Sequence, residues 1–317
     1  MATALIGSML ALFAMSVPVA IAIGIASLIC LYLFTNLPGL LLAQQLFTSL
    51  DKYPLAAIPF FILAGNLMDV GGISRRLVDV AKALVGGIQG GLGVACVLTC
   101  MMFAAVSGSS VATTFAIGAI LIPAMVRHGY PSNFAAALQA SSAELGVIIP
   151  PSIPMILYAV SAEVSVGEMF IAGIGPGLLI GGALAVFVYV WCRIKGLGKR
   201  DGDERSPLGR AIVGAWAALL MPVVIIGGIY GGVFTPTEAS AVAVFYALLV
   251  GGFVYRELRW EDLPAVVGKS VVSSAGIMFI IANAGLFSFL INRAEVPQMV
   301  ADLITNNIDS ALAFLLA

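Results

Sequence analysis

A cluster of hydroxyl side chains interrupts an apolar stretch and is the first feature of this chain that could do chemistry. It reads Ser107-Gly108-Ser109-Ser110, and Thr113 and Thr114 follow it. A helix that ends here leaves carbonyl groups without donors, and a helix that begins here leaves amides without acceptors. Carbonyl and hydroxyl oxygens can replace the hydration shell of Na⁺, whereas helix amides favour a carboxylate. The alternative is that Ser109 or Ser110 only caps the second helix.

A second interruption follows at Gly146-Val147-Ile148-Ile149-Pro150-Pro151-Ser152-Ile153-Pro154. Proline has no amide donor and clashes with preceding carbonyls, so a helix must unwind here. The freed carbonyls need partners, which a cation or neighbouring side chains can supply. The two interruptions together predict one Na⁺ site. Its candidate residues are Ser107, Gly108, Ser109, Ser110, Thr113, Gly146, Ile149, Pro150, Pro151 and Ser152.

Four polar residues are candidates for contacting a substrate: Thr114, Ser142, Glu144 and Asn66. Glu144 lies one turn before the prolines, and a carboxylate inside a membrane is costly enough to indicate function, unless it faces a hydrated cavity. Interfacial anchoring is the alternative for Asn66. Cys96 and Cys100 share a helix face without a nearby histidine, so we interpret them as packing residues.

The composition sets the environment of these residues. The chain has 317 residues, of which 61% are hydrophobic and 10% charged, against about 25% charged in soluble domains. Lipid must therefore surround much of it, and the predicted class is an all-α polytopic membrane protein. Gly227, Gly228, Gly231 and Gly232 form two overlapping Gly-x-x-x-Gly pairs, which we expect at a helix–helix contact. A net charge of −1 gives no basic field for nucleic acid.

The hydroxyl cluster lies between two short apolar arms, 92–107 and 111–126. Each arm spans about 24 Å as a helix, less than the hydrocarbon core of about 30 Å. We therefore predict a re-entrant helical hairpin over 92–126, and two true crossings are the alternative. Six basic residues lie between Arg193 and Arg210, which predicts a cytoplasmic loop and places the entry to the hairpin on that side.

A faint internal repeat indicates the domain organisation. Val17-Pro18 and Thr235-Pro236 each head an apolar helix, and Ala64-Gly65 and Ala284-Gly285 follow at nearly the same distance. The predicted topology gives the two copies opposite orientations, as in secondary transporters. The predicted parts are a first inverted repeat over 1–195 with the hairpin and a broken helix over 132–160, a cytoplasmic loop over 196–210, and a second repeat over 211–317. Because the second repeat lacks a partner hairpin, we expect its C-terminal part to be missing.

Four motifs in this order resemble the large, M-type membrane subunit of tripartite ATP-independent periplasmic (TRAP) transporters, over essentially the whole chain. They are Pro59-Phe60-Phe61-Ile62-Leu63-Ala64-Gly65, Ser107-Gly108-Ser109-Ser110-Val111-Ala112-Thr113, Ile148-Ile149-Pro150-Pro151-Ser152-Ile153 and Phe234-Thr235-Pro236-Thr237-Glu238-Ala239. The resemblance implies a Na⁺-driven importer of organic acids, such as a dicarboxylate or sialic acid, in the bacterial inner membrane. It also implies an elevator mechanism and a first Na⁺ site at 107–110 and near Pro150. Glu144 departs from the small or hydroxyl residue expected there.

The same resemblance implies two protein partners, a small four-helix membrane subunit and a periplasmic substrate-binding protein. The motifs of hydrolases, ATPases and zinc sites are absent from the sequence, so we expect no enzyme activity, no cofactor and no metal beyond Na⁺. One alternative is a stand-alone Na⁺-coupled dicarboxylate carrier with a similar hairpin. The other is a membrane enzyme or passive channel, and an enzyme would need more acid/base residues at depth than Glu144.

Overall fold

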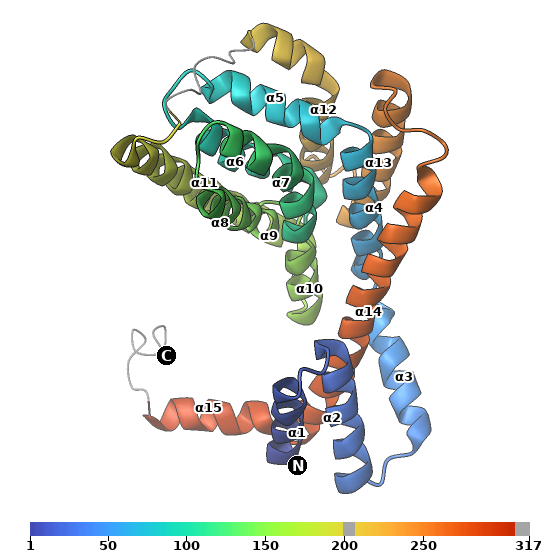
Figure 1. Cartoon of the computed structure of the whole chain (residues 1–317). Helices are drawn as coiled ribbons and strands as arrows, with labels where there is room; N and C mark the ends of the chain where they lie inside the picture. The colour runs from blue at the N-terminus through green and yellow to red at the C-terminus, as the bar shows by residue number, and fades with distance from the viewer. Residues whose placement is uncertain (199–206, 308–317) are drawn as a thin grey trace. The chain divides into compact units, whose positions relative to one another are not determined.

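The computed structural model describes residues 1–198 and 207–307, with side chains up to residue 302 (Figure 1). Within these ranges the chain is helical and contains no strand. It divides into two compact units. The first consists of 1–52 and 275–317, and the second of 53–274.

The first unit begins with three helices and ends with two, of which α14 starts in the second unit. They are α1 (Ala2–Ala14), α2 (Val19–Phe34), α3 (Gly39–Leu50), α14 (Leu263–Arg293) and α15 (Val296–Asn307). A small core forms where Leu5, Cys30 and Leu290 are buried together. Gly24 lies against the Asn283 side chain, because a Cβ atom at Gly24 would come within 2.5 Å of the Asn283 amide oxygen.

The second unit contains the remaining helices. They are η1 (Tyr53–Ala56), α4 (Ala57–Val70), α5 (Ile73–Val85), α6 (Gly91–Ser107), α7 (Ser110–Arg127), α8 (Ser132–Ala143), α9 (Leu145–Ile148), α10 (Ile153–Ser161), α11 (Val166–Lys195), α12 (Leu208–Tyr230), α13 (Pro236–Leu249) and η3 (Val250–Val254). The loop predicted over 196–210 lies largely outside the described residues.

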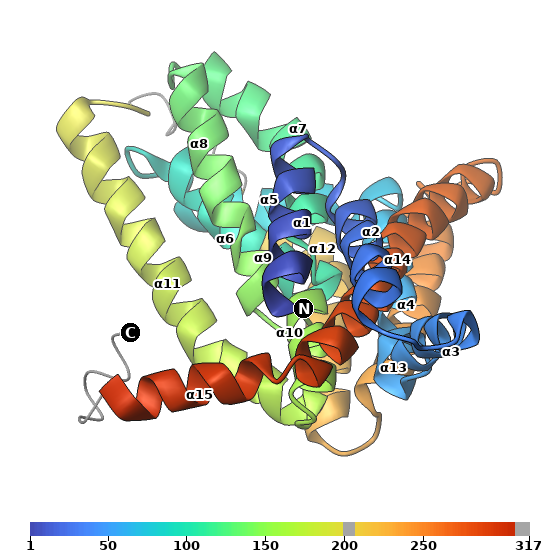
Figure 2. The same cartoon turned by 90° about the horizontal axis from the view of Figure 1, so that it is seen from below.

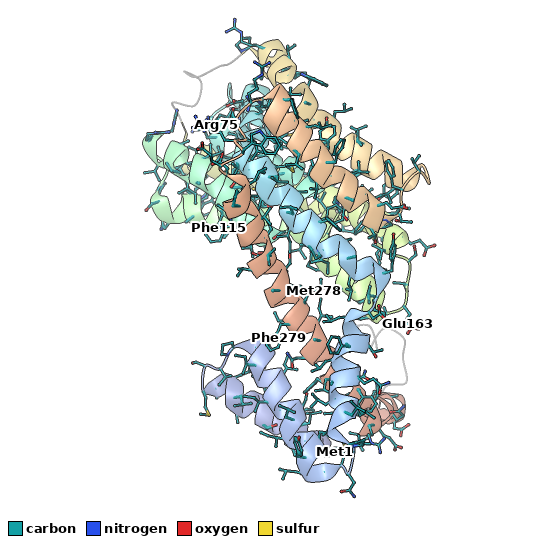
Figure 3. All side chains as sticks on the ribbon, turned by 90° about the vertical axis from the view of Figure 1, so that its right-hand side faces the viewer. Met1, Arg75, Phe115, Glu163, Met278 and Phe279 are labelled. Carbon is teal, nitrogen blue, oxygen red and sulfur yellow. The ribbon has the colours of Figure 1, made fainter. Side chains whose placement is uncertain are left out.

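Six described helices are long and apolar enough to cross a membrane, and there are seven if the bent pair 132–148 and 153–161 is one span. Apolar side chains also face outward from these helices; Phe115 on α7, labelled in Figure 3, is 71% exposed. Lipid or a partner subunit can cover such surface, whereas its exposure to water is unfavourable in free energy. The prediction of an all-α polytopic membrane protein is therefore confirmed.

The predicted hairpin corresponds to α6 and α7, which lie side by side and are joined by Gly108 and Ser109 (Figure 1). Thirteen of the seventeen residues of α6 are buried. Protein therefore surrounds this arm, as a backbone break at membrane depth requires. Because α7 has 18 residues and meets the length criterion by itself, the re-entrant path remains a prediction.

The turn between α4 and α5 packs against the segment that follows α13. The Arg76 guanidinium forms an ion pair with Glu257 at 2.7 Å and stacks over the Tyr255 ring at 3.6 Å from its centroid. Gly71 and Gly251 bring the two backbones together, since a Cβ atom at Gly71 would lie 3.0 Å from the Gly251 Cα atom. These contacts join the segment after α13 to α4 and α5, which pack against the hairpin.

Among the described residues, the glycines near the end of α12 make no contact with another helix, unlike the expected role. No atom of the described residues lies within 4 Å of a Cβ atom built on Gly227, and the one built on Gly228 meets the nearby Phe234 ring. Gly231 and Gly232 follow the helix, and Gly232 takes φ +70° in the turn toward α13. Glycine is used here for a chain reversal, which the Gly-x-x-x-Gly spacing does not distinguish from helix packing.

Candidate functional site

The tip of the hairpin is a two-residue turn. The helix α6 ends at Ser107, Gly108 takes the left-handed conformation with φ +61°, and Ser109 is extended. The Ser109 hydroxyl accepts a hydrogen bond from the Ala112 amide at 3.3 Å. The side chain of Ser109 is therefore the N-cap of α7, which is the capping role considered as an alternative for this residue.

Two other hydroxyls of the tip, those of Ser107 and Thr113, lie next to each other. The Ser107 and Thr113 hydroxyl oxygens lie 3.2 Å apart, and both side chains are buried. Thr113 also donates to the Ser109 carbonyl at 2.8 Å, and Thr114 donates to the Ser110 carbonyl at 2.8 Å. Ser107 and Thr113 thus present two adjacent oxygens inside the protein.

The predicted broken helix is confirmed. The segments 132–148 and 153–161 are bent by 42°, and the Pro150–Pro151 peptide bond is cis. In a continuous helix the Gly146 and Val147 carbonyls would accept from residues 150 and 151, but both are prolines without an N–H group. The Ser152 hydroxyl replaces one donor by bonding to the Val147 carbonyl at 2.5 Å.

The Gly146 carbonyl loses its helical donor in the same way. Ser152 also accepts from the Met155 amide at 3.4 Å and so caps α10. Side chains therefore satisfy part of the break, as the kink interpretation requires, whereas residue 150 offers no amide to the carbonyl of buried Gly146.

The hairpin tip and the broken helix touch each other. The Ile153 amide donates to the Gly108 carbonyl at 3.1 Å. A Cβ atom at Gly108 would lie 2.6 Å from the Pro151 carbonyl oxygen, and one at Gly146 would lie 3.1 Å from the Ser109 carbonyl carbon and oxygen. Seen from below, α8 and α9 lead to α10 through this break (Figure 2). The structure therefore gathers the ten candidate ion-binding residues at one place.

The four candidates for substrate contact behave differently. Glu144 is exposed between α8 and α9, whereas Ser142 is buried with a hydroxyl that has no hydrogen-bond partner. Asn66 on α4 donates to the Ser270 hydroxyl on α14 at 2.9 Å. Within the described residues, no hydrogen bond joins any two of Thr114, Ser142, Glu144 and Asn66. Their predicted role in substrate contact stays a prediction.

Gln139 is a buried polar residue that the sequence analysis missed. Its side chain is 1% exposed and lies between the two hairpin arms. The Cys96 thiol donates to its Oε1 atom at 3.0 Å, and its Nε2 atom donates to the Thr113 carbonyl at 3.2 Å. The sequence did contain a signal for this residue. Gln139 lies three residues before Ser142 and seven before Gly146, and this spacing places all three on one face of a helix.

Comparison with known proteins decides the family. The model of the family described as the tripartite ATP-independent periplasmic transporter, DctM component, matches residues 6–317. This chain belongs to that family. The family consists of transporter components, and the polytopic membrane architecture agrees with it.

Members of the DctM family with assigned functions are similar to this chain. The C4-dicarboxylate TRAP transporter large permease protein DctM of Pseudomonas aeruginosa is 46% identical over 284 residues, which cover 89% of this chain and 66% of the relative. The protein of the same name from Rhodobacter capsulatus is 42% identical, with 95% and 71% covered. The isethionate TRAP transporter permease protein DctMQ of Oleidesulfovibrio alaskensis is 42% identical, with 95% and 47% covered. The chain thus spans about two thirds of the length of the first two relatives.

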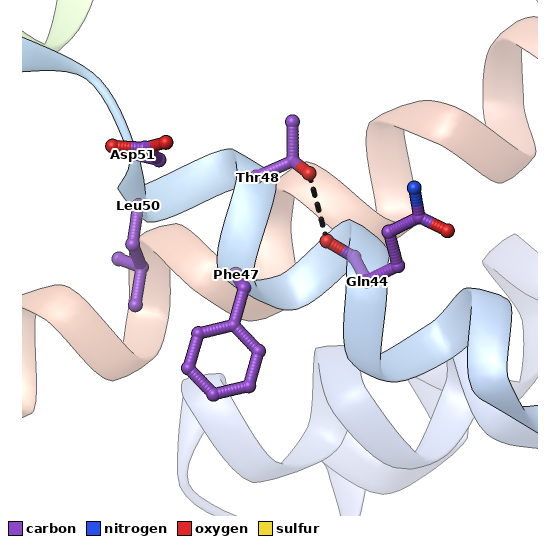
Figure 4. Close-up of a pocket in the computed structure, with 5 residues that line it drawn as sticks. All are labelled: Gln44, Phe47, Thr48, Leu50 and Asp51. Atoms are coloured by element: carbon purple, nitrogen blue, oxygen red, sulfur yellow. Dashed lines mark hydrogen bonds between the residues drawn. The ribbon is translucent and has the colours of Figure 1, made fainter.

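In the described part of this DctM-family chain, neither the metal-ligating side chains nor a surface hollow gives a stronger candidate site. Among the described residues no group of three His, Cys, Asp or Glu side chains could hold a metal ion. An open hollow on α3 is lined by Gln44, Phe47, Thr48, Leu50 and Asp51 (Figure 4). The Thr48 hydroxyl there donates to the Gln44 carbonyl of its own helix at 2.8 Å. The contact between hairpin tip and broken helix therefore remains the candidate site.

Proposed function

We propose that this chain forms part of the large permease of a Na⁺-coupled TRAP transporter and that the hairpin tip and the broken helix bind the coupling ion. The observation that carries the proposal is the direct contact between the two backbone breaks at Gly108 and Gly146. A backbone break inside a membrane protein needs a partner for its freed carbonyls. Two breaks in contact can share one cation as that partner.

The capping pattern favours a cation over an anion at this site. Two helices, α6 and α9, end here with the negative ends of their dipoles, and two helices, α7 and α10, begin here with the positive ends. Ser109 and Ser152 cap the two N-termini and accept from their amides. The amides that would attract a carboxylate are therefore partly occupied, whereas the Gly146 carbonyl keeps its lone pairs for a ligand.

The ligands are then oxygens without formal charge. Hard cations such as Na⁺ prefer backbone carbonyl and hydroxyl oxygens, and the buried Ser107 and Thr113 hydroxyls lie at the same tip. We propose that four of the ten predicted residues form a central set of ligands. This set is the Gly146 and Ile149 carbonyls with the Ser107 and Thr113 hydroxyls. Ile149 is included because the amide of residue 153, its helical donor, bonds to Gly108 instead.

The proposed substrate is an organic acid, and the names of two relatives, both C4-dicarboxylate TRAP transporter permeases, favour a C4-dicarboxylate. The proposed partners are a small membrane subunit and a periplasmic binding protein in the bacterial inner membrane, with the 193–210 loop in the cytoplasm and an elevator motion of the hairpin. A stand-alone Na⁺-coupled carrier is the second candidate, since the site at the two breaks serves either architecture.

Uptake by reconstituted vesicles tests both parts of the proposal. The complete permease with its small subunit is placed in vesicles, and uptake of a radiolabelled C4-dicarboxylate is measured with and without a Na⁺ gradient and with and without the binding protein. We expect uptake only when the gradient and the binding protein are both present. Uptake driven equally well by K⁺ would contradict Na⁺ coupling, and uptake without the binding protein would favour the stand-alone carrier.

A further inference from the structure

Gln139 is the side chain of the broken helix that bonds to both arms of the hairpin. It accepts from the Cys96 thiol on α6 at 3.0 Å and donates to the Thr113 carbonyl on α7 at 3.2 Å. The Cys100 sulfur, one turn along α6, lies 3.6 Å from its Nε2 atom. A primary amide can donate and accept at once, which neither a carboxylate nor an apolar side chain can do.

The bond to Thr113 leads directly to the tip. The Thr113 hydroxyl donates to the Ser109 carbonyl at 2.8 Å and lies 3.2 Å from the Ser107 hydroxyl oxygen. Thr113 therefore accepts a hydrogen bond from Gln139 at its carbonyl and makes two contacts with the tip through its hydroxyl. Thr113 thus connects the Gln139 side chain to the tip.

The packing around Gln139 leaves space for this side chain on α7. A Cβ atom at Gly118 would lie 3.2 Å from the Gln139 Cγ atom, a closer approach than ordinary van der Waals contact. Burial makes the amide costly unless its polar atoms are paired. If this position needed only a side chain of the right volume, leucine or methionine would fill it without the free-energy cost of burying an amide.

We propose that Gln139 is a positioning residue that sets the geometry of the ion site by holding Thr113 and both hairpin arms in register. This inference rests on the proposed Na⁺ site and adds to it a residue that does not contact the ion. It predicts that the loss of the Gln139 bonds weakens Na⁺ binding even though every ion ligand is still present.

The test is a Na⁺ titration of uptake in the complete complex carrying Gln139→Leu. We expect the Na⁺ concentration for half-maximal uptake to rise about 3- to 10-fold, as the loss of one buried hydrogen bond implies. The control is Leu138→Ala on the same helix, because Leu138 is 5% exposed and packs toward Gly93 rather than toward Thr113. We expect this control to lower the thermal stability of the complex and to leave the Na⁺ midpoint unchanged.

The variant Gln139→Glu separates the hydrogen bond from the packing. Its protonated carboxyl can donate to the Thr113 carbonyl and accept from Cys96, whereas the ionised form can only accept. The Na⁺ midpoint of this variant is compared with that of the unmodified complex at the same pH. If the carboxyl becomes protonated between pH 8 and pH 6, the two midpoints should converge as the pH falls. If it is protonated over the whole range, they should agree at every pH. A midpoint that matches Gln139→Leu at every pH would overturn the positioning role.

The two proposals fail in different ways. If uptake by the unmodified complex does not depend on Na⁺, the ion site itself is wrong. If that uptake depends on Na⁺ and Gln139→Leu has an unshifted midpoint, only the positioning role is wrong.

Discussion

Several helices of the second unit contain prolines in their interior. Two regions with prolines, at Pro222 and at Pro150, respond in opposite ways. The helix α12 continues through Pro222 from Leu208 to Tyr230, whereas the helix that begins with α8 breaks at Pro150 and Pro151. Two tyrosines support α12 near its proline: the Tyr246 hydroxyl donates to the Ala217 carbonyl at 2.8 Å, and the Tyr255 hydroxyl accepts from the Ala218 amide at 3.0 Å.

The comparison shows what distinguishes a structural kink from a candidate site. Near Pro222, the hydroxyls of Tyr246 on α13 and of Tyr255 directly after η3 bond to the backbone of α12. At Pro150, part of the backbone is satisfied by Ser152, and another backbone break, the hairpin tip, is in direct contact. Proline alone is therefore weak evidence for a site, whereas two interruptions in contact are strong evidence.

The largest expected effect comes from Gly108→Ala. Its added Cβ atom would lie 2.6 Å from the Pro151 carbonyl oxygen, and φ +61° is unfavourable for alanine by about 1–2 kcal/mol. The broken helix must move away, so Na⁺-dependent uptake should be lost.

Gly232→Ala is the matched control for this substitution. It has a similar φ of +70°, and no atom of the described residues lies within 4 Å of its Cβ position. We expect this variant to have the backbone strain and a lower melting temperature but to keep its Na⁺-dependent uptake. Equal loss of uptake in both variants, at equal amounts of assembled complex, would mean that backbone strain and not the contact with Pro151 is responsible.

A smaller effect is expected from Gly146→Ala. The new methyl group would lie 3.1 Å from the Ser109 carbonyl carbon and oxygen, so the tip must yield by a few tenths of an ångström. We expect the Na⁺ midpoint of uptake to rise about 5- to 10-fold, equivalent to roughly 1–1.4 kcal/mol. Gly182→Ala in α11, with no described atom within 4 Å of its Cβ position, should leave the midpoint unchanged. A normal midpoint in Gly146→Ala would separate this glycine from the ion site.

The smallest effect on transport is expected at the structural kink. Tyr246→Phe removes the hydroxyl that donates to the Ala217 carbonyl and should lower the stability of the permease by about 0.5–1.5 kcal/mol. The Na⁺ midpoint of the folded fraction should not change. A thermal melt in detergent measures the first quantity, and the uptake titration measures the second. A shifted midpoint would mean that the two proline regions are coupled and that their contrast is incomplete.

Local sequence signals predicted much of this architecture. The hairpin expected over 92–126 is α6 and α7 over 91–127, and the break expected within 132–160 lies between Ile148 and Ile153. Glycine, serine and proline act on their own backbone, so their effects can be predicted without knowing the tertiary neighbours. The structure also contains a capping box between Thr235 and Glu238, which depends on local sequence in the same way.

Predictions that depended on tertiary neighbours were less complete. Gln139 was missed because its partners, Cys96 and Thr113, are more than 25 positions away in the chain. Helical geometry alone predicts that Glu144 points away from the hairpin. It lies five residues after Gln139, which corresponds to a rotation of about 140° around the helix axis. The structure places Glu144 at the surface accordingly.

The central claim is that the hairpin tip and the broken helix bind one Na⁺ ion. Its most direct test is a Na⁺ titration of uptake in the complete complex carrying Ser107→Ala, compared with Ser240→Ala. Both serines are buried, and the Ser240 hydroxyl donates to the Thr237 carbonyl of its own helix, α13. Loss of one oxygen ligand at Ser107 should raise the Na⁺ midpoint about 5- to 150-fold, equivalent to roughly 1–3 kcal/mol, and raised Na⁺ should restore uptake while raised substrate should not. An unshifted midpoint in Ser107→Ala, with the same loss of stability as in Ser240→Ala, would contradict a Na⁺ site that includes the tip hydroxyls.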